Sequence, residues 1–97
     1  MLFILRFTNK PDVADRLPQL YPAHMQWLSE HPQVLVPGAI RTDPEKPPIG
    51  GLWIVEAESK AEVESLFQTD PFWVNGLRQG YEILHWSKAF PDKKVPV

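Results

Sequence analysis

The sequence contains no cysteine among its 97 residues, and this absence excludes several kinds of site at once. Disulfides, thiolate nucleophiles, cysteine-based zinc sites and iron–sulfur clusters all require that side chain. An excess of one charge is also missing, because 10 Lys and Arg stand against 12 Asp and Glu and give a formal net charge of −2. No block of like charge disturbs this balance, so the sequence predicts neither a nucleic-acid partner nor a membrane surface as partner.

Long apolar runs are absent too. The longest one, from Met1 to Leu5, is far shorter than the roughly 20 residues that a membrane-spanning helix needs. No basic segment precedes it, so it does not have the form of a signal peptide. We therefore expect one cytoplasmic domain over residues 1–90, followed by a polar tail over residues 91–97.

Short apolar segments alternate with helical stripes along the chain. Strands are expected at residues 2–7, 34–40, 52–57 and 81–86. One helix is expected to end before His31, a second to begin at the capping residue Ser59, and a short third to begin at Asp70. The order β-α-β-β-α-β predicts an α+β, ferredoxin-like fold, with a four-stranded antiparallel sheet and the helices on one face.

The first helix contains two prolines, Pro18 and Pro22. Either one fits a first helical turn, but both cannot lie inside a regular helix without a kink, so we expect a broken first half. If Pro22 begins the regular part, His24 lies in the first turn, where the helix dipole favours a neutral imidazole.

The predicted strands are apolar on both faces. Leu2 and Ile4 point to one side of the first strand, while Phe3, Leu5 and Phe7 point to the other. Because the helices cover only one face, the other face needs a second cover, and we predict a homodimer whose sheets pack face to face.

Two residues are candidates for acid/base chemistry. His24 lies on the apolar stripe of the first helix, where it is either a packed core histidine or a sheltered base. Asp70 precedes Pro71, where it is either a helix N-cap or a carboxylate that orients a histidine and stabilises its charged form. The topology allows the two elements to approach each other.

Other polar and aromatic residues give weaker signals. Arg6 and Arg41 lie near strand ends and either bind an anionic group or are simply solvated. Tyr21 and Trp27 line an aromatic pocket or belong to the core. No histidine has a second ligand at metal-binding spacing, and Gly50-Gly51 has no phosphate-binding pattern but permits close backbone approach. No metal is predicted.

Several short motifs together resemble a known family. They are Pro22–Leu28, the turn Val36–Ala39, Gly50-Gly51, Asp70-Pro71-Phe72 and a last strand that ends in Trp86. In this order and spacing, residues 1 to 90 resemble the YCII-related family. The resemblance implies a ferredoxin-like subunit that dimerises into an α+β barrel, with His24 and Asp70 as a general acid/base pair.

With this resemblance, we expect a cofactor-independent enzyme that acts on a small molecule. The expected reaction is elimination, dehydrochlorination or isomerisation of a hydroxylated aromatic or lactone-like compound, with His24 and Asp70 as catalytic residues. Contacts to the substrate are assigned to Arg6, Tyr21, Trp27 and Phe72. The alternative is a non-catalytic module that binds a small ligand or serves as a dimeric interaction surface.

Overall fold

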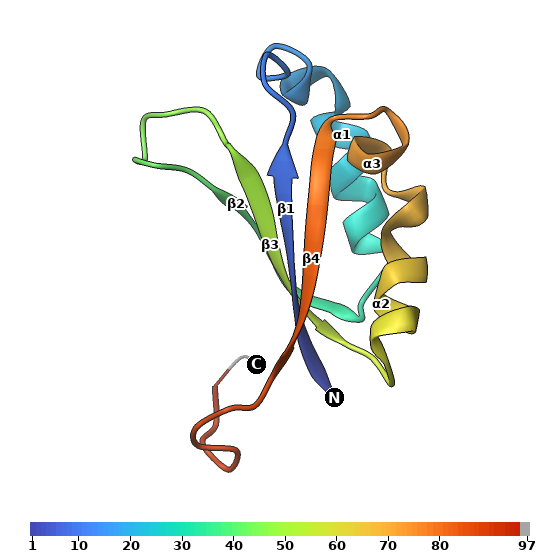
Figure 1. The fold of residues 1–97 in the computed structure, drawn as a ribbon, viewed down its shortest axis with the longest axis vertical. Coiled ribbons are helices and arrows are strands. Elements are labelled where there is room, and N and C mark those ends of the chain that lie inside the picture. The colour runs from blue at the N-terminus through green and yellow to red at the C-terminus, as the bar shows by residue number, and fades with distance from the viewer. Residues whose placement is uncertain (96–97) are drawn as a thin grey trace.

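A computed structural model describes residues 1–95 and contains one four-stranded antiparallel sheet. Its strands are β1 (Leu2–Asn9), β2 (Val34–Ile40), β3 (Gly50–Glu56) and β4 (Arg78–Trp86), in the spatial order β2-β3-β1-β4 (Figure 1). The central strand β1 pairs with β3 and with β4, so that Leu5 lies between Trp53 and Ile83. This order, together with the helices on one face, confirms the predicted ferredoxin-like α+β fold.

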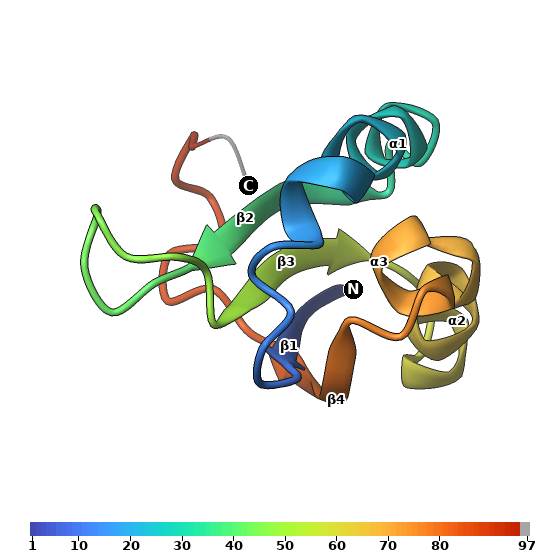
Figure 2. The same cartoon turned by 90° about the horizontal axis from the view of Figure 1, so that it is seen from above.

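The helices all lie on one side of the sheet (Figures 1 and 2). Helix α1 (Leu17–Ser29) connects β1 to β2, and three short helices connect β3 to β4. They are α2 (Lys60–Leu66), the 3-10 helix η1 (Phe67–Thr69) and α3 (Pro71–Val74). The Ser59 hydroxyl accepts a hydrogen bond from the Glu62 amide at 3.2 Å, which confirms Ser59 as the predicted cap of α2. None of these helices is both long enough and apolar enough to span a membrane.

The core lies between the helices and the sheet. Alternate residues of β1, namely Phe3, Leu5 and Phe7, are buried on the helical side, as the period of two in a strand requires. Trp27 of α1 and Trp53 of β3 stack with ring centroids 5.5 Å apart within the same cluster. This packing joins α1 to β3, one of the two inner strands of the sheet.

Helix α1 differs from the expectation, because it continues through Pro22 without the predicted break. Pro18 lies in the first turn, where its missing N–H does no harm, so only Pro22 removes a hydrogen bond from the helix interior. Consequently His24 lies in the middle of α1 and not in its first turn. The argument that the helix dipole keeps its imidazole neutral is therefore wrong.

Strand β4 also begins earlier in the sequence than expected. Gly76 has a φ of 71°, a left-handed conformation that ends the helix, and the Leu77 amide donates back to the Phe72 carbonyl at 3.0 Å. The strand then starts at Arg78, three residues before the predicted Tyr81. As a result, Arg78 is part of the sheet and lies beside the end of β1, where its partner in the ladder is Asn9.

The second face of the sheet carries no helix. On it, Ile4 is paired with Ile54 on one side and with Leu84 on the other, and Leu84 is 43% exposed. Arg6 and Glu82 form an ion pair across β1 and β4 on this same face. Residues 87–95 form no helix or strand, and residues 96 and 97 of the predicted tail lie outside the described residues.

Candidate active site

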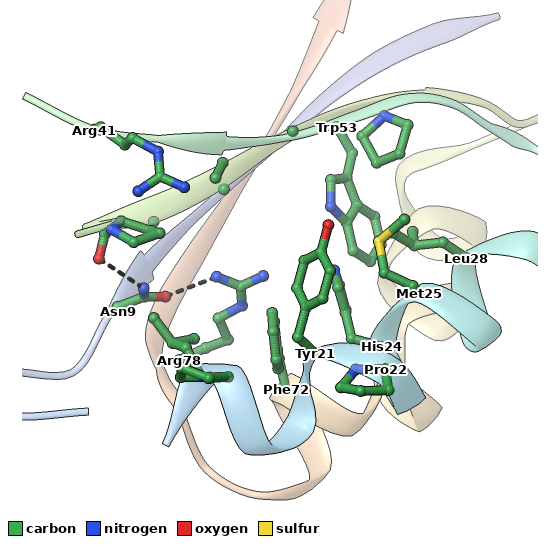
Figure 3. A pocket seen from close by; sticks show the side chains of 18 residues that line it. Asn9, Tyr21, Pro22, His24, Met25, Leu28, Arg41, Trp53, Phe72 and Arg78 are labelled. Atoms are coloured by element: carbon green, nitrogen blue, oxygen red, sulfur yellow. Dashed lines mark hydrogen bonds between the residues drawn. The ribbon is translucent and has the colours of Figure 1, made fainter. Parts of the chain in front are cut away.

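A cavity of about 570 Å³ opens between α1, the start of α3 and one end of the sheet (Figure 3). Helix α1 contributes one wall, which includes His24, and β3 contributes another, which includes Gly51 and Trp53. Phe72 of α3 and Arg78 at the start of β4 also line the cavity. Elements from the first and the second half of the chain therefore meet around one space that is large enough for a small organic molecule.

His24 and Asp70 are in direct contact. Nδ1 of His24 lies 2.6 Å from Oδ1 of Asp70, and the two residues are only 7% and 0% exposed. A carboxylate accepts hydrogen bonds, so Nδ1 carries the hydrogen and donates it to Asp70. Nε2 is then the ring nitrogen that accepts or donates a proton on the other side, and no residue within 1–95 forms a hydrogen bond with it.

Asp70 reaches His24 because it does not use its side chain as a helix cap. It occupies the N-cap position of α3, but its side chain forms no capping hydrogen bond, and only its carbonyl accepts from Val74. Its second carboxylate oxygen, Oδ2, is buried and has no partner within the described chain. Of the two positions that the sequence left open for this side chain, the structure therefore shows the contact with a histidine and not the capping hydrogen bond.

Phe72 fixes the plane of the imidazole. Its ring stacks on His24 with a centroid distance of 4.0 Å and an interplanar angle of 10°. Trp53 lies on the inner side, 6.2 Å from the imidazole centroid. The hydrogen bond to Asp70 and the stack on Phe72 together leave His24 one orientation, which is what a positioned general acid or base requires.

Arg78 is a residue of the cavity that the sequence analysis did not identify. Its side chain is 7% exposed, and Nη1 donates a 2.7 Å hydrogen bond to Oδ1 of Asn9. Burial lowers the pKa of Arg78 to about 10, and the negative charge of Asp70 acts in the opposite direction. A guanidinium with this pKa remains charged at neutral pH, so the cavity contains a permanent buried cation.

The glycine pair at the start of β3 allows close backbone approach, as predicted. A Cβ on Gly50 would lie 2.1 Å from the carbonyl oxygen of Phe7, and one on Gly51 would lie 3.3 Å from Nη2 of Arg78. Gly50 therefore permits the tight pairing of β3 with β1, and Gly51 keeps space beside the guanidinium.

The family is shown by a direct match. The model of the YCII-related domain matches residues 1–87 of the 97-residue chain. The chain belongs to the YCII-related domain family. No functionally curated protein matches the sequence of this YCII-related domain.

Solved structures show the same fold. The 5-chloro-2-hydroxyhydroquinone dehydrochlorinase TftG from Burkholderia phenoliruptrix AC1100, in complex with 2,5-dihydroxybenzoquinone, is 29% identical, with a TM-score of 0.76. The match covers 90% of this chain and 94% of that one, and it supports a small-molecule enzyme at a coarse level.

More distant neighbours show the fold alone. An antibiotic biosynthesis monooxygenase is 20% identical, with a TM-score of 0.55 and coverage of 92% of this chain and 99% of its own. Protein Atu4242 from Agrobacterium tumefaciens is 18% identical, with a TM-score of 0.52 and coverage of 94% and 98%.

Of the six expected site residues of the YCII-related domain, three line the cavity and a fourth contacts one of these three. His24 and Phe72 line its inner part, and Tyr21, which is 54% exposed, lies at its mouth. Asp70 lies behind His24 and is fully buried. Arg41, which was considered as an anion-binding residue, also lines the cavity, while its Nη1 donates to the Lys46 carbonyl at 2.8 Å.

The two other expected residues lie elsewhere. Arg6 is on the helix-free face of the sheet, because its position in β1 alternates with the buried residues Leu5 and Phe7. Trp27 packs in the core, where its indole Nε1 donates to the Thr69 hydroxyl at 2.8 Å. Neither side chain lines the cavity of the described chain, so the structure does not support contacts from them to a ligand bound there.

The described residues offer no obvious metal site. No group of three or more His, Cys, Asp or Glu within residues 1–95 is arranged to hold an ion. The polar groups of the cavity are instead one histidine backed by a carboxylate and a guanidinium backed by an amide.

Proposed function

We propose that this YCII-related domain is a cofactor-independent enzyme in which His24 and Asp70 transfer protons to and from a small hydroxylated aromatic or lactone-like substrate. The observation that carries the proposal is the 2.6 Å contact between His24 and a carboxylate that is fully buried beside a cavity. If Asp70 served only to cap α3, its side chain would accept a hydrogen bond from an amide of that helix. Its side chain instead contacts a histidine 46 positions away in the sequence.

The geometry suggests the proton path. Nε2 of His24 removes a proton from a hydroxyl or an activated carbon of the substrate, and the imidazolium that forms is stabilised by Asp70. The electron pair left behind forms a new carbonyl or carbon–carbon double bond. In an elimination, a leaving group such as chloride departs with its bonding electrons, whereas in an isomerisation His24 returns the proton to another atom of the same molecule. Neither route consumes an oxidant or a reductant.

The match with TftG supports the elimination branch. That protein is a dehydrochlorinase of a chlorinated hydroxyhydroquinone, and its subunit resembles this one over nearly the whole length. We include dehydrochlorination, other eliminations and lactone isomerisation in the proposed reaction class.

We also propose that the active form is a homodimer. The helix-free face presents Ile4, Ile54 and Leu84 side by side, and no segment of residues 1–95 covers Leu84. An apolar sheet face of this kind is typically buried in an interface, and a second copy of the same chain would bury it symmetrically.

The test is a turnover screen followed by a matched pair of histidine variants. Chlorinated hydroxyhydroquinones, other hydroxylated aromatics and lactones are offered to the unaltered protein. His24→Gln should lower kcat for an accepted substrate by about 100- to 10,000-fold. His85→Gln is the control, because His85 is exposed on β4 and does not line the cavity.

Two outcomes contradict the proposal. One is an unchanged kcat in His24→Gln. The other is a melting temperature of His24→Gln so low that unfolding explains the whole loss of activity, since this would make His24 a packing residue. If compounds bind in the cavity but none is turned over, the domain is a small-ligand-binding module.

A further inference from the structure

Arg78 is a buried cation that no carboxylate of the described chain pairs with. It is 7% exposed, yet no carboxylate within residues 1–95 lies within ion-pair distance of it. Its Nε is buried without a hydrogen-bond partner, and Nη1 has only the neutral oxygen of Asn9. A buried charge is costly unless it is paired, so the folded chain alone leaves this cation incompletely compensated.

Among residues 1–95, Asp70 is the acid whose charge acts on Arg78, but it does not pair with the guanidinium. Its charge acts on Arg78 at a distance, while its Oδ1 is held by His24. When His24 takes a proton during turnover, the charge of Asp70 balances the imidazolium. Arg78 then has no counter-charge of its own, and an anion that enters the cavity would supply one.

The surroundings of Arg78 position its guanidinium for a flat ligand. The guanidinium lies over Phe7 at 4.5 Å and over Phe72 at 5.1 Å, measured to the ring centroids. Asn9 holds Nη1 and is itself tied to the Pro48 carbonyl at 3.4 Å (Figure 3). Since Gly51 has no side chain, the space beside Nη2 is kept open.

Phe72 also links Arg78 to the proposed base. The same ring that faces the guanidinium stacks on the imidazole of His24 at 4.0 Å. A planar molecule in the cavity would therefore meet a fixed cation near one part of its ring and the proton-transferring nitrogen near another.

We propose that Arg78 binds an anionic oxygen of the substrate, so that the site selects planar aromatic or quinoid anions, such as ionised ring hydroxyls or carboxylates, over neutral compounds of the same size. This inference rests on the proposed function for the reaction, but it concerns binding and can be tested without turnover. The bidentate fork of a guanidinium suits two oxygens of a delocalised anion.

A suitable probe is 2,5-dihydroxybenzoquinone, the compound bound to TftG. Each of its hydroxyls is a vinylogous carboxylic acid and is ionised at neutral pH. Hydroquinone, which has the same ring size and two neutral hydroxyls at pH 7, is the matched neutral probe. Dissociation constants for both are measured by calorimetry under anaerobic conditions.

The unaltered protein should bind the quinone anion at least about 10-fold more tightly than hydroquinone, because hydrogen bonds to a buried charge are stronger than neutral ones. Arg78→Met should weaken binding of the anion by about 10- to 100-fold and leave hydroquinone within about 3-fold. Arg78→Lys should recover part of the loss. Lys60→Met is the control for net charge, since Lys60 is exposed on α2 and does not line the cavity.

The inference is overturned if the unaltered protein binds the two probes equally. It is also overturned if Arg78→Met weakens both to the same extent, which would make Arg78 a structural counter-charge to Asp70. If Arg78→Met does not fold, the comparison of the two probes on the unaltered protein and on Arg78→Lys decides.

His24→Gln separates this inference from the proposed function. The variant should keep the preference for the anion, because Arg78 is unchanged. Preference for the anion without turnover of any compound would contradict the proposed function alone. Turnover that depends on His24 without any preference for the anion would contradict the role of Arg78 alone.

Discussion

Asp70 occupies the N-cap position of α3, but its Oδ1 lies 2.6 Å from Nδ1 of His24 and its side chain caps no helix amide. A capping hydrogen bond would stabilise the helix by about 1 kcal/mol. The carboxylate instead bridges α3 to the middle of α1 from a fully buried position. This arrangement is the basis for assigning proton transfer to His24.

Replacing Asp70 with Asn keeps the volume of the side chain and removes its charge. Without that charge the imidazolium form of His24 loses its stabilisation, so kcat should fall by about 100- to 10,000-fold, with a smaller change in KM. Steady-state kinetics on an accepted substrate measure this effect. Asp43→Asn, in the exposed loop between β2 and β3, is the control. Retention of more than half of kcat in Asp70→Asn would show that the pair is structural.

The three glycines at positions 50, 51 and 80 should respond differently to alanine. Gly50→Ala forces a Cβ to within 2.1 Å of the Phe7 carbonyl oxygen, so the strands must separate, at a cost of about 1–3 kcal/mol or more. Gly80 has open space around it, so Gly80→Ala should be neutral or slightly stabilising.

Gly51→Ala lies between these cases. Its Cβ would approach both Nη2 of Arg78 and the Gly38 carbonyl oxygen at 3.3 Å, so we expect a modest loss of stability and weaker binding of the quinone anion. Urea unfolding midpoints for the three variants test the order. Equal stabilities of Gly50→Ala and Gly80→Ala would disprove the close approach of β3 to β1.

The predicted homodimer should depend on the helix-free face of the sheet. Leu84→Lys places a charge on that face, beside Ile4 of the central strand β1, and should convert the dimer to a monomer at micromolar concentration. Val74→Lys is the matched control, because Val74 is 65% exposed on α3, on the helical side. Sedimentation equilibrium gives the masses. A monomeric unaltered protein, or a dimer that Leu84→Lys leaves intact, would refute this interface.

Pro22 interrupts the hydrogen bonds of α1 without ending the helix. Pro22→Ala restores an amide that can donate to the Pro18 carbonyl, and it should raise the free energy of unfolding by about 1–2 kcal/mol. Pro18→Ala, in the first turn, should change stability by only about 0.5 kcal/mol or less. Guanidinium denaturation compares the two variants. A less stable Pro22→Ala would mean that the proline ring, which lines the cavity, contributes more by packing than its missing N–H costs.

The residues around the cavity show which features of the site sequence patterns predict and which they do not. His24 was singled out because it lies on an apolar stripe, and the structure places it at the helix–sheet interface, although the expected break at Pro22 and the dipole argument built on it were wrong. Trp27 lies on the same stripe but packs in the core. Helical periodicity predicts which side of a helix faces inward, but it does not predict whether that side meets a packed core or a cavity.

Arg6 and Arg78 illustrate the same limit for strands. Arg6 was assigned to the substrate because it lies near a strand end, but the alternation along β1 turns it to the opposite face. The sequence patterns do not identify Arg78, because they predict a last strand that begins only at Tyr81 and so leave Arg78 in the segment that connects Asp70 to that strand. The left-handed Gly76 makes that connection short enough for Arg78 to join β4 beside Asn9.

By itself, the sequence determined the order of strands and helices, the cap at Ser59 and the apolar composition of the sheet, because each depends on periodicity and on contacts between near neighbours. Only the tertiary structure decided that the Asp70 carboxylate contacts His24 instead of capping its helix, and that Arg78 enters the same cavity bonded to Asn9 and not to a carboxylate of residues 1–95. Those contacts join residues 46 and 69 positions apart, and their energies depend on burial and on the register of the strands, which no local pattern encodes.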